Sequence, residues 1–193
     1  MSKSSPYHLS ENDINKEKEL ITKAQKNPKD FAPIYDCYFL PIFKYVIKRV
    51  QDEEQASEIT SDIFAKSLLK LNKFQFKGFP FSSWLYQIAR NEIVDFYRKN
   101  QASKYVQVSE NELNYLIDSS ETDLLSVLDK EEKINQILTC LKQLSDSEIE
   151  LIEYKYFEDR SYKEIAEIIE TTETNARVKT HRAIAILKYL IKK

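Results

Sequence analysis

Glycine is nearly absent from this sequence. Among its 193 residues there is one, Gly78, where average usage would give about 13. Phosphate-binding loops, dinucleotide-binding turns and the nucleophile elbows of hydrolases all need glycine where the backbone takes a positive φ or approaches a ligand closely. The scarcity of glycine therefore excludes these classes of enzyme and indicates a mostly helical protein.

Cysteine, histidine and long apolar runs are also scarce. The two cysteines (Cys37 and Cys140) and the two histidines (His8 and His181) lie too far apart in the sequence to predict a four-ligand zinc site, and they suggest a reducing compartment without disulfide bonds. No apolar run reaches the ~18 residues that span a bilayer, and the polar N-terminus is unlike a signal peptide. We therefore expect a cytoplasmic protein without metal or cofactor. The residues suggest no catalytic constellation, so we expect neither an enzyme nor a small-molecule substrate.

Apolar residues at helical spacing are abundant, since 42% of the chain is hydrophobic and 31% is charged. The three- and four-residue period of helices runs through residues 16–100 and again through 131–193. It fades over 101–130, which are rich in Ser, Asn, Asp and Glu. The sequence thus predicts an all-α protein with a disordered tail (1–15), a helical domain (16–100), a polar linker (101–130) and a second helical domain (131–193).

The second domain contains the pattern of a helix-turn-helix. Ser161 and Glu164 form a capping box, which satisfies free N–H groups at the start of a helix. The turn follows at Glu170, where such motifs usually carry glycine, and Thr172 is a candidate N-cap for the next helix.

Charge separates sharply across this motif. Residues 146–170 hold nine acidic and three basic side chains, whereas residues 173–193 hold six basic and one acidic. A basic helix that merely balances a charged bundle would give the same count. The capping box and the turn spacing favour DNA binding instead, because the second helix of such a motif enters the major groove. The residues expected on its solvent-exposed face are Asn175, Arg177, Val178, Lys179, His181 and Arg182.

The first domain carries a polar stripe along the helix that follows residue 80. Gln87, Arg90 or Asn91, Asp95 and Arg98 recur three or four residues apart, opposite an apolar face. Neighbouring aromatic residues could stack on unpaired bases. Because Phe and Trp at helical spacing are more often core residues, spacing alone leaves both interpretations open.

Three segments together resemble the extracytoplasmic-function (ECF) group of bacterial RNA polymerase sigma factors, over about residues 20–190. The stretch DEEQASEITSDIFAKSLLKL (52–71) is similar to that family's polymerase-binding helix. FPFSSWLYQIARNEIVDFYRK (79–99) is similar to its promoter-melting helix. Residues 141–187 are similar to its C-terminal helix-turn-helix.

The resemblance implies a role for each segment. The first would bind the clamp helices of core RNA polymerase through Asp52, Gln55, Glu58 and Asp62. The second would bind and melt the minus-ten element, and the loop over residues 77–81 would receive a flipped base. The residues implied in this role are Lys77, Phe79, Phe81, Gln87, Arg90, Asn91, Asp95 and Arg98. The third would read the minus-thirty-five element of promoter DNA with the exposed face predicted above.

The resemblance also implies protein partners. The acidic stretch Asp146–Tyr156 would dock on the flap of the second-largest polymerase subunit, and the acidic linker would pass near the basic nucleic-acid channels of the polymerase. An anti-sigma factor, which can be membrane-anchored, would hold the free protein.

Two other functions remain as alternatives. A stand-alone helix-turn-helix regulator would act as a dimer on palindromic duplex DNA, but the chain has no leucine-rich dimer seam. An all-helical enzyme or an adaptor would leave the basic face without a role. The net charge of −2 also favours a polymerase-directed protein, because a DNA-binding protein acting alone normally carries a strong positive excess.

Overall fold

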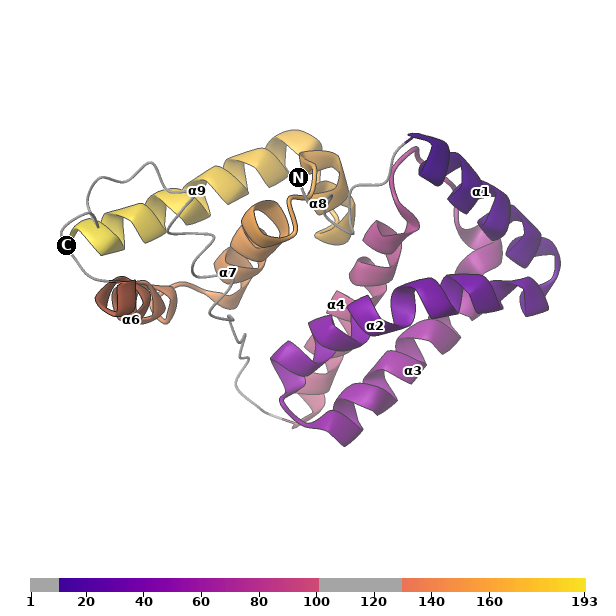
Figure 1. Ribbon diagram of the computed structural model, residues 1–193, viewed down its shortest axis with the longest axis horizontal. Coiled ribbons are helices and arrows are strands. Elements are labelled where there is room, and N and C mark those ends of the chain that lie inside the picture. Colours follow the sequence, from indigo (N-terminus) through magenta and orange to yellow (C-terminus); the bar gives the residue numbers. More distant parts are fainter. Residues whose placement is uncertain (1–10, 101–129) are drawn as a thin grey trace.

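The computed structural model describes residues 11–100 and 130–193, and every regular element within these two ranges is helical. The expected all-α class is confirmed. Figure 1 shows the first domain and the second lying against each other, with α8 beside α4. No helix in the described ranges is both long and apolar enough to cross a bilayer.

The first domain packs its helices around a shared apolar core. Local capping sets the boundaries: Asp52 Oδ1 accepts from Gln55 N at 2.8 Å and starts α3, while Gln51 takes φ 60° and ends α2. The elements are α1 (Glu11–Lys26), η1 (Pro28–Phe31), α2 (Ala32–Val50), α3 (Glu53–Lys70), η2 (Leu71–Lys73) and α4 (Phe81–Asn100).

The expected disordered tail proves too long, because α1 begins at Glu11 and includes residues 11–15. Tertiary contacts explain why this polar segment is helical. Glu17, Ile21 and Ala24 are buried against the rest of the domain, and Glu17 Oε2 accepts from the backbone N of Phe81 at 2.8 Å. A carboxylate on α1 thus satisfies a backbone donor at the start of α4.

The second domain has the helix-turn-helix that its sequence predicts. Both halves of the Ser161–Glu164 capping box are formed, and Thr172 caps the last helix. The turn between them closes with Thr171 N donating to Ala166 O at 2.9 Å. The elements are α6 (Lys130–Leu141), α7 (Asp146–Ile152), the π-helical turn η4 (Glu153–Phe157), α8 (Tyr162–Ile168) and α9 (Glu173–Lys192).

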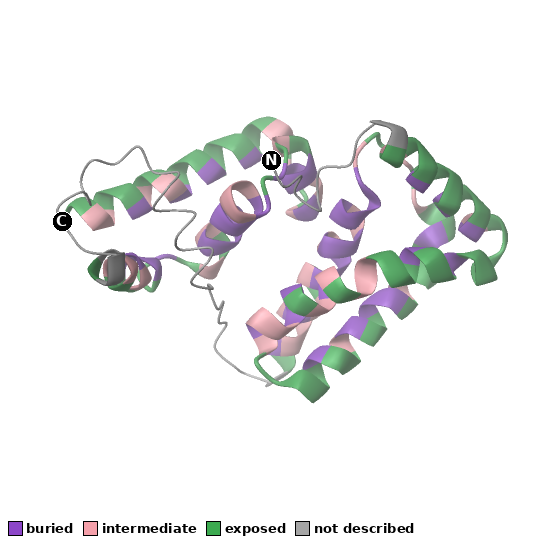
Figure 2. Ribbon diagram, viewed as in Figure 1, coloured by how far each residue is buried: buried purple, intermediate pink, exposed green. Residues whose placement is uncertain are grey.

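Of the two hydrophobic cores in the described ranges, one is shared by both domains. Leu151, Tyr154 and Ile165 belong to the same buried cluster as Tyr45 and Tyr86 of the first domain, and Figure 2 shows this buried layer where the domains meet. A separate cluster joins α6, α7 and α9. The sequence predicted two domains on a tether, whereas the structure packs one against the other. The predicted linker lies almost wholly outside the described residues.

Candidate nucleic-acid interface

Helix α9 has one side buried in the domain and the opposite side exposed to solvent. Ala176, Thr180, Ala183 and Leu187 anchor the helix in the domain, at the positions that helical spacing indicates. Every residue predicted to read duplex DNA is exposed, including Val178, whose side chain is 58% accessible. These residues are Asn175, Arg177, Val178, Lys179, His181 and Arg182.

A tyrosine that sequence reasoning missed supports this face. The guanidinium carbon of Arg177 lies 5.0 Å from the ring centroid of Tyr162, and Tyr162 Oη lies 3.4 Å from His181 Nε2. Glu173 Oε1 lies 3.5 Å from Arg177 Nη2 and forms an ion pair with it. Tyr162 is the first residue of α8, and its only signal in the sequence is an aromatic residue directly after the N-cap.

The polar stripe of α4 lies along one side of that helix. Asn91 and Arg98 are exposed, whereas Gln87, Arg90 and Asp95 are partly buried. Arg98 forms an ion pair with Asp95 at 3.0 Å. The stripe therefore presents amide and guanidinium donors together.

The loop before α4 contains the single glycine. Gly78 takes φ +84°, a conformation that L side chains rarely adopt, and it turns the chain between exposed Lys77 and half-buried Phe79. This requirement explains why the one glycine of the chain stands here.

The prediction for Phe81 is wrong. Its side chain is 0% exposed, with ring centroids 5.0 Å from Phe74 and 5.2 Å from Trp84. Because Phe81 begins α4 at the junction with α1, its ring fills the core. It therefore cannot receive a base in this conformation.

Carboxylates of the second domain pair with half of the predicted minus-ten residues. Lys77 Nζ lies 2.8 Å from both carboxylate oxygens of Glu167. Glu170 Oε1 accepts from Gln87 Nε2 at 2.6 Å and from Asn91 Nδ2 at 3.4 Å.

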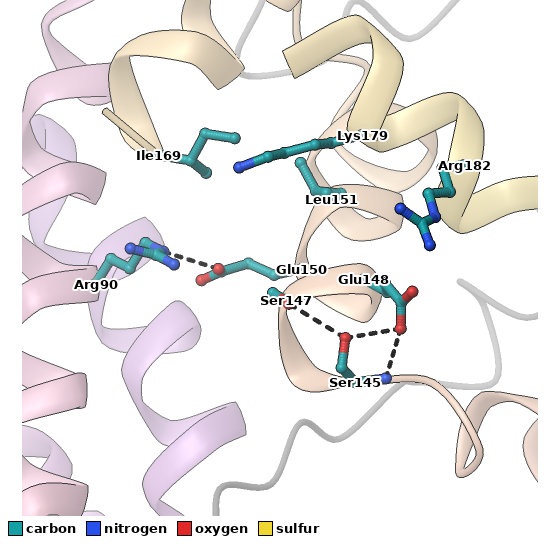
Figure 3. A pocket seen from close by; sticks show the side chains of 9 residues that line it. All are labelled: Arg90, Ser145, Ser147, Glu148, Glu150, Leu151, Ile169, Lys179 and Arg182. Carbon is teal, nitrogen blue, oxygen red and sulfur yellow. Dashed lines mark hydrogen bonds and ion pairs between the residues drawn. The ribbon is translucent and has the colours of Figure 1, made fainter. Parts of the chain in front are cut away.

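The fourth residue of this group is Arg90. Its Nε lies 2.9 Å from Glu150 Oε2, and Figure 3 shows this pair bridging α4 and α7. The pair borders a cavity of about 260 Å³ that Lys179 and Arg182 of α9 also line. Burial lowers the pKa of the Arg90 guanidinium, but the Glu150 charge and hydrogen bond more than offset this and leave it raised.

A buried polar network lies beneath these contacts. Glu150 Oε1 accepts from Tyr45 Oη at 2.7 Å, and Tyr154 Oη lies 2.7 Å from the same Tyr45 oxygen. Glu153 pairs with Arg49 and, at 3.4 Å, with Lys48. Burial alone would raise the pKa of Glu153, but these two cations more than offset it and hold the pKa below its usual value.

Arg160 completes the junction. Its side chain is fully buried, and its guanidinium carbon lies 4.1 Å from the ring centroid of Tyr86. It pairs with Glu158 and approaches Ser82 Oγ at 3.5 Å. The junction thus combines ion pairs with cation–π and apolar contacts.

The assignment of Asp146–Tyr156 to the polymerase flap needs correction for this conformation. Glu150, Leu151, Glu153 and Tyr154 are buried, and their partners lie on α2 and α4. The charge pattern alone could not show this, because it does not distinguish an external partner from an internal one.

The residues predicted to bind polymerase lie on an exposed face. Asp52, Gln55, Glu58 and Asp62 all project from the start and outer side of α3. The nearby Leu69 is also strongly exposed.

Fold and surfaces together define a class: a DNA-binding protein with a helix-turn-helix in one domain and a second candidate binding edge in another. Residues 34–103 match sigma-70 region 2, and residues 134–187 match sigma-70 region 4. The RNA polymerase sigma factor YlaC of Bacillus subtilis is 30% identical over 84% of this chain and 92% of its own length. The chain belongs to the ECF group of the sigma-70 family.

Further relatives agree with this assignment. The ECF RNA polymerase sigma factor BldN of Streptomyces coelicolor is 26% identical over 90% of the chain, which spans 65% of the length of BldN. Among solved structures, CnrH in complex with the cytosolic domain of CnrY aligns with a TM-score of 0.58 at 17% identity, over 91% of this chain and 96% of that one. The sigma factor RpoE from Bartonella quintana, in complex with the anti-sigma factor NepR, aligns with a TM-score of 0.56 at 20% identity, over 85% and 98%. These two likenesses support the fold.

Proposed function

We propose that this protein directs core RNA polymerase to promoters as an ECF-type initiation factor. The exposed basic face of α9, on the second helix of a helix-turn-helix in a sigma-70 region 4 domain, carries this proposal. The protein supplies positioning and base capture and performs no chemistry of its own. It acts in the cytoplasm, where promoter DNA is transcribed.

The α9 face reads the minus-thirty-five element from the major groove. Arg177 and Arg182 can donate two hydrogen bonds to guanine, and Asn175 can bind adenine in the same bidentate way. Val178 offers an apolar contact for a thymine methyl group. Lys179 and His181 lie beside them and contact the DNA backbone.

The polar edge of α4 binds the minus-ten element as it opens. Asn91 and Arg98 are exposed donors suited to the non-template strand, and Phe79 offers a partly exposed ring on which a base can stack. Gln87, Arg90, Asp95 and Lys77 complete this edge. Capturing unstacked bases favours melting, because each captured base offsets part of the cost of opening the duplex.

Core polymerase and an anti-sigma factor are the proposed protein partners. Asp52, Gln55, Glu58 and Asp62 present acidic and amide groups for the clamp helices. The solved structure of CnrH contains the cytosolic domain of CnrY, and that of RpoE contains the anti-sigma factor NepR. These complexes support an anti-sigma partner here.

Transcription in vitro tests this function. Core polymerase from the source bacterium, with fragments of its genomic DNA, should yield discrete promoter-specific transcripts only when this protein is added. Arg177→Ala should reduce them, while Lys188→Ala, which removes an exposed positive charge from the same helix outside the predicted face, should not. Absence of any protein-dependent transcript would refute the proposal, and a stand-alone regulator would then have to be reconsidered.

A further inference from the structure

We propose that the cavity between α4, α7 and α9 binds a small phosphomonoester, a phosphorylated metabolite no larger than a mononucleotide. Both domains contribute to its lining, with Arg90 from α4, Leu151 from α7, Ile169 from the end of α8, and Lys179 and Arg182 from α9. Binding of a metabolite is an activity beyond promoter recognition.

Two cations of α9 border the cavity without a partner. Within the described ranges, the side chain of neither Lys179 nor Arg182 forms a hydrogen bond or an ion pair. Figure 3 shows Lys179 extending from α9 toward the α4 side and Arg182 extending toward α7. Both are exposed, so they stand at the open side of the cavity, where a ligand enters from solution. Phosphate oxygens accept strong hydrogen bonds from such groups, and arginine can donate to two of them at once.

The carboxylates beside the cavity already have partners of their own. Glu150 accepts from Arg90 Nε at 2.9 Å and from Tyr45 Oη at 2.7 Å, through different oxygens. Glu148 Oε2 accepts from the backbone N of Ser145 at 2.8 Å and from its hydroxyl at 2.7 Å, in the capping box of α7. These contacts use the negative charges of the lining within the protein. An anion from solution therefore finds the two α9 cations available.

Size and apolar lining limit the class of ligand. The cavity holds about 260 Å³, just below the ~300 Å³ at which pockets for drug-sized ligands begin. Buried Leu151 and half-buried Ile169 supply apolar surface for an organic body. An inorganic ion would leave this surface unused, and a chain of nucleotides is far larger than the cavity. A compact phosphomonoester uses both the cations and the apolar surface.

Occupancy of the cavity has a consequence for DNA if α9 reads the minus-thirty-five element. Lys179 and Arg182 belong to that predicted face, so the ligand and the duplex compete for the same two side chains. The apparent affinity for the duplex then falls as the ligand concentration rises. This consequence rests on the proposed function, whereas ligand binding itself does not.

Isothermal titration calorimetry on the full chain at fixed ionic strength tests the site, with AMP as the probe. Lys179→Gln with Arg182→Gln removes both unpartnered cations and should weaken AMP binding about tenfold or more, because two charge-assisted contacts are lost. The control is Lys188→Gln with Lys192→Gln, which removes two exposed charges of α9 outside the cavity. Both variants change net charge equally, and the control should bind AMP like the wild type.

Three further probes define what the cavity recognises. Adenosine lacks the phosphate and should not bind, whereas inorganic phosphate lacks the organic body and should bind more weakly than AMP. A dinucleoside monophosphate, which carries only a phosphodiester, should also bind more weakly, because it is larger and bears one negative charge less than the AMP dianion. A minus-thirty-five duplex, added in competition, tests the consequence for DNA.

Each contrary result overturns the proposal in a distinguishable way. Absence of AMP binding, or an equal loss in both double variants, would show that the cavity is no anion site. Adenosine as tight as AMP would remove the phosphate from recognition, and inorganic phosphate as tight as AMP would remove the organic body. A dinucleoside monophosphate as tight as AMP would assign the cavity to the DNA backbone instead. If AMP binds as expected but the duplex does not compete, the ligand site stands and the assignment of Lys179 and Arg182 to promoter reading fails.

Discussion

At the scale of single residues, Tyr162 connects the two halves of the helix-turn-helix. Its ring lies on α8, while its partners Arg177 and His181 lie on the exposed face of α9. An arginine held over an aromatic face loses less rotamer freedom when it binds a base than a freely moving one would. Under the proposed function, Tyr162 is therefore a positioning residue for duplex reading.

Substitution of Tyr162 separates its two contacts. Tyr162→Phe keeps the ring under Arg177 and removes only the hydroxyl near His181, so promoter binding by the polymerase complex should change little. Tyr162→Ala should weaken it about threefold to tenfold, equivalent to about 0.7–1.4 kcal/mol. Dissociation constants on minus-thirty-five duplexes check this, with a scrambled element as control. An equal loss in both variants would show that the hydroxyl, and not the ring, is what matters.

Whether the structural role of a residue could be predicted from the sequence depends on how far along the chain its interaction partners lie. Ser161, Glu164 and Thr172 were predictable because a cap depends on neighbours within four residues. Phe81 was not, because its ring also packs near Tyr38 on α2 and its backbone N is bonded to Glu17 on α1, more than fifty residues earlier in the chain. Glu170 stood out in the sequence as an unusual turn residue, but its partners on α4 could not be read from local pattern.

At the scale of elements, α1 fixes the start of α4. Glu17 accepts from the backbone N of Phe81 at 2.8 Å and from the hydroxyl of Tyr38. Burial raises the pKa of Glu17, although both hydrogen bonds favour the ionised form. A segment that composition assigned partly to a disordered tail thus orients the helix bearing the proposed minus-ten edge.

Glu17 variants should lower stability in a graded order. Glu17→Ala leaves the Phe81 N–H and the Tyr38 hydroxyl without their buried acceptor and should cost about 1–3 kcal/mol in the free energy of unfolding. Glu17→Gln retains one acceptor oxygen and should cost less. Urea denaturation followed by circular dichroism measures both, with exposed Glu19→Ala as the matched control. Wild-type stability in Glu17→Ala would contradict a capping role.

The segment between η4 and α8 predicts a pH dependence. Burial raises the pKa of Glu158 to about 7, although Arg160 partly opposes the shift. The folded pKa lies above the ordinary value of 4.5, so the associated stability is complete below that value and is lost as pH rises through about 7. Glu153, with its lowered pKa, stays ionised across this window.

Thermal unfolding between pH 5 and pH 8 tests this assignment. The melting temperature of the wild type should fall over the window by the equivalent of about 1–3 kcal/mol. Glu158→Gln, which mimics the protonated carboxyl, should flatten the decline, whereas Asp159→Asn on the exposed neighbour should preserve it. Parallel profiles for wild type and Glu158→Gln would rule out this carboxyl as the source.

At the scale of the whole molecule, the division into two domains follows from local sequence, whereas the packing of one domain against the other follows from long-range contacts. Periodicity, caps and charge blocks indicated two helical domains, because each depends on local sequence. The closed arrangement depends on pairs such as Arg90–Glu150 and Lys77–Glu167, which are 60 and 90 residues apart. The sequence pattern of these acidic residues is equally consistent with a surface that binds an external partner. The sequence therefore could not show that their partners lie on α4.

The closed arrangement also bears on how polymerase must act. A promoter presents its two elements at separate positions along one DNA, and side chains of the α4 edge are bonded to the second domain while the domains are in contact. Under the proposed function, binding of α3 to polymerase would accompany separation of the second domain from α4, driven by the difference in binding free energy between the two states.

Energy transfer between two dyes would follow this separation in the full chain. Exposed Cys37 on α2 provides one attachment point and Lys188→Cys on α9 the other, while Cys140 is buried. Transfer should be high in the free protein and should fall when core polymerase is added, even without DNA. In the Glu167→Gln, Glu170→Gly background it should already be low, and polymerase should change it little, because the closed state has lost its contacts. If transfer in the wild type is the same with and without saturating polymerase, the domains do not part on assembly, and the minus-ten strand must be bound through some surface other than α4.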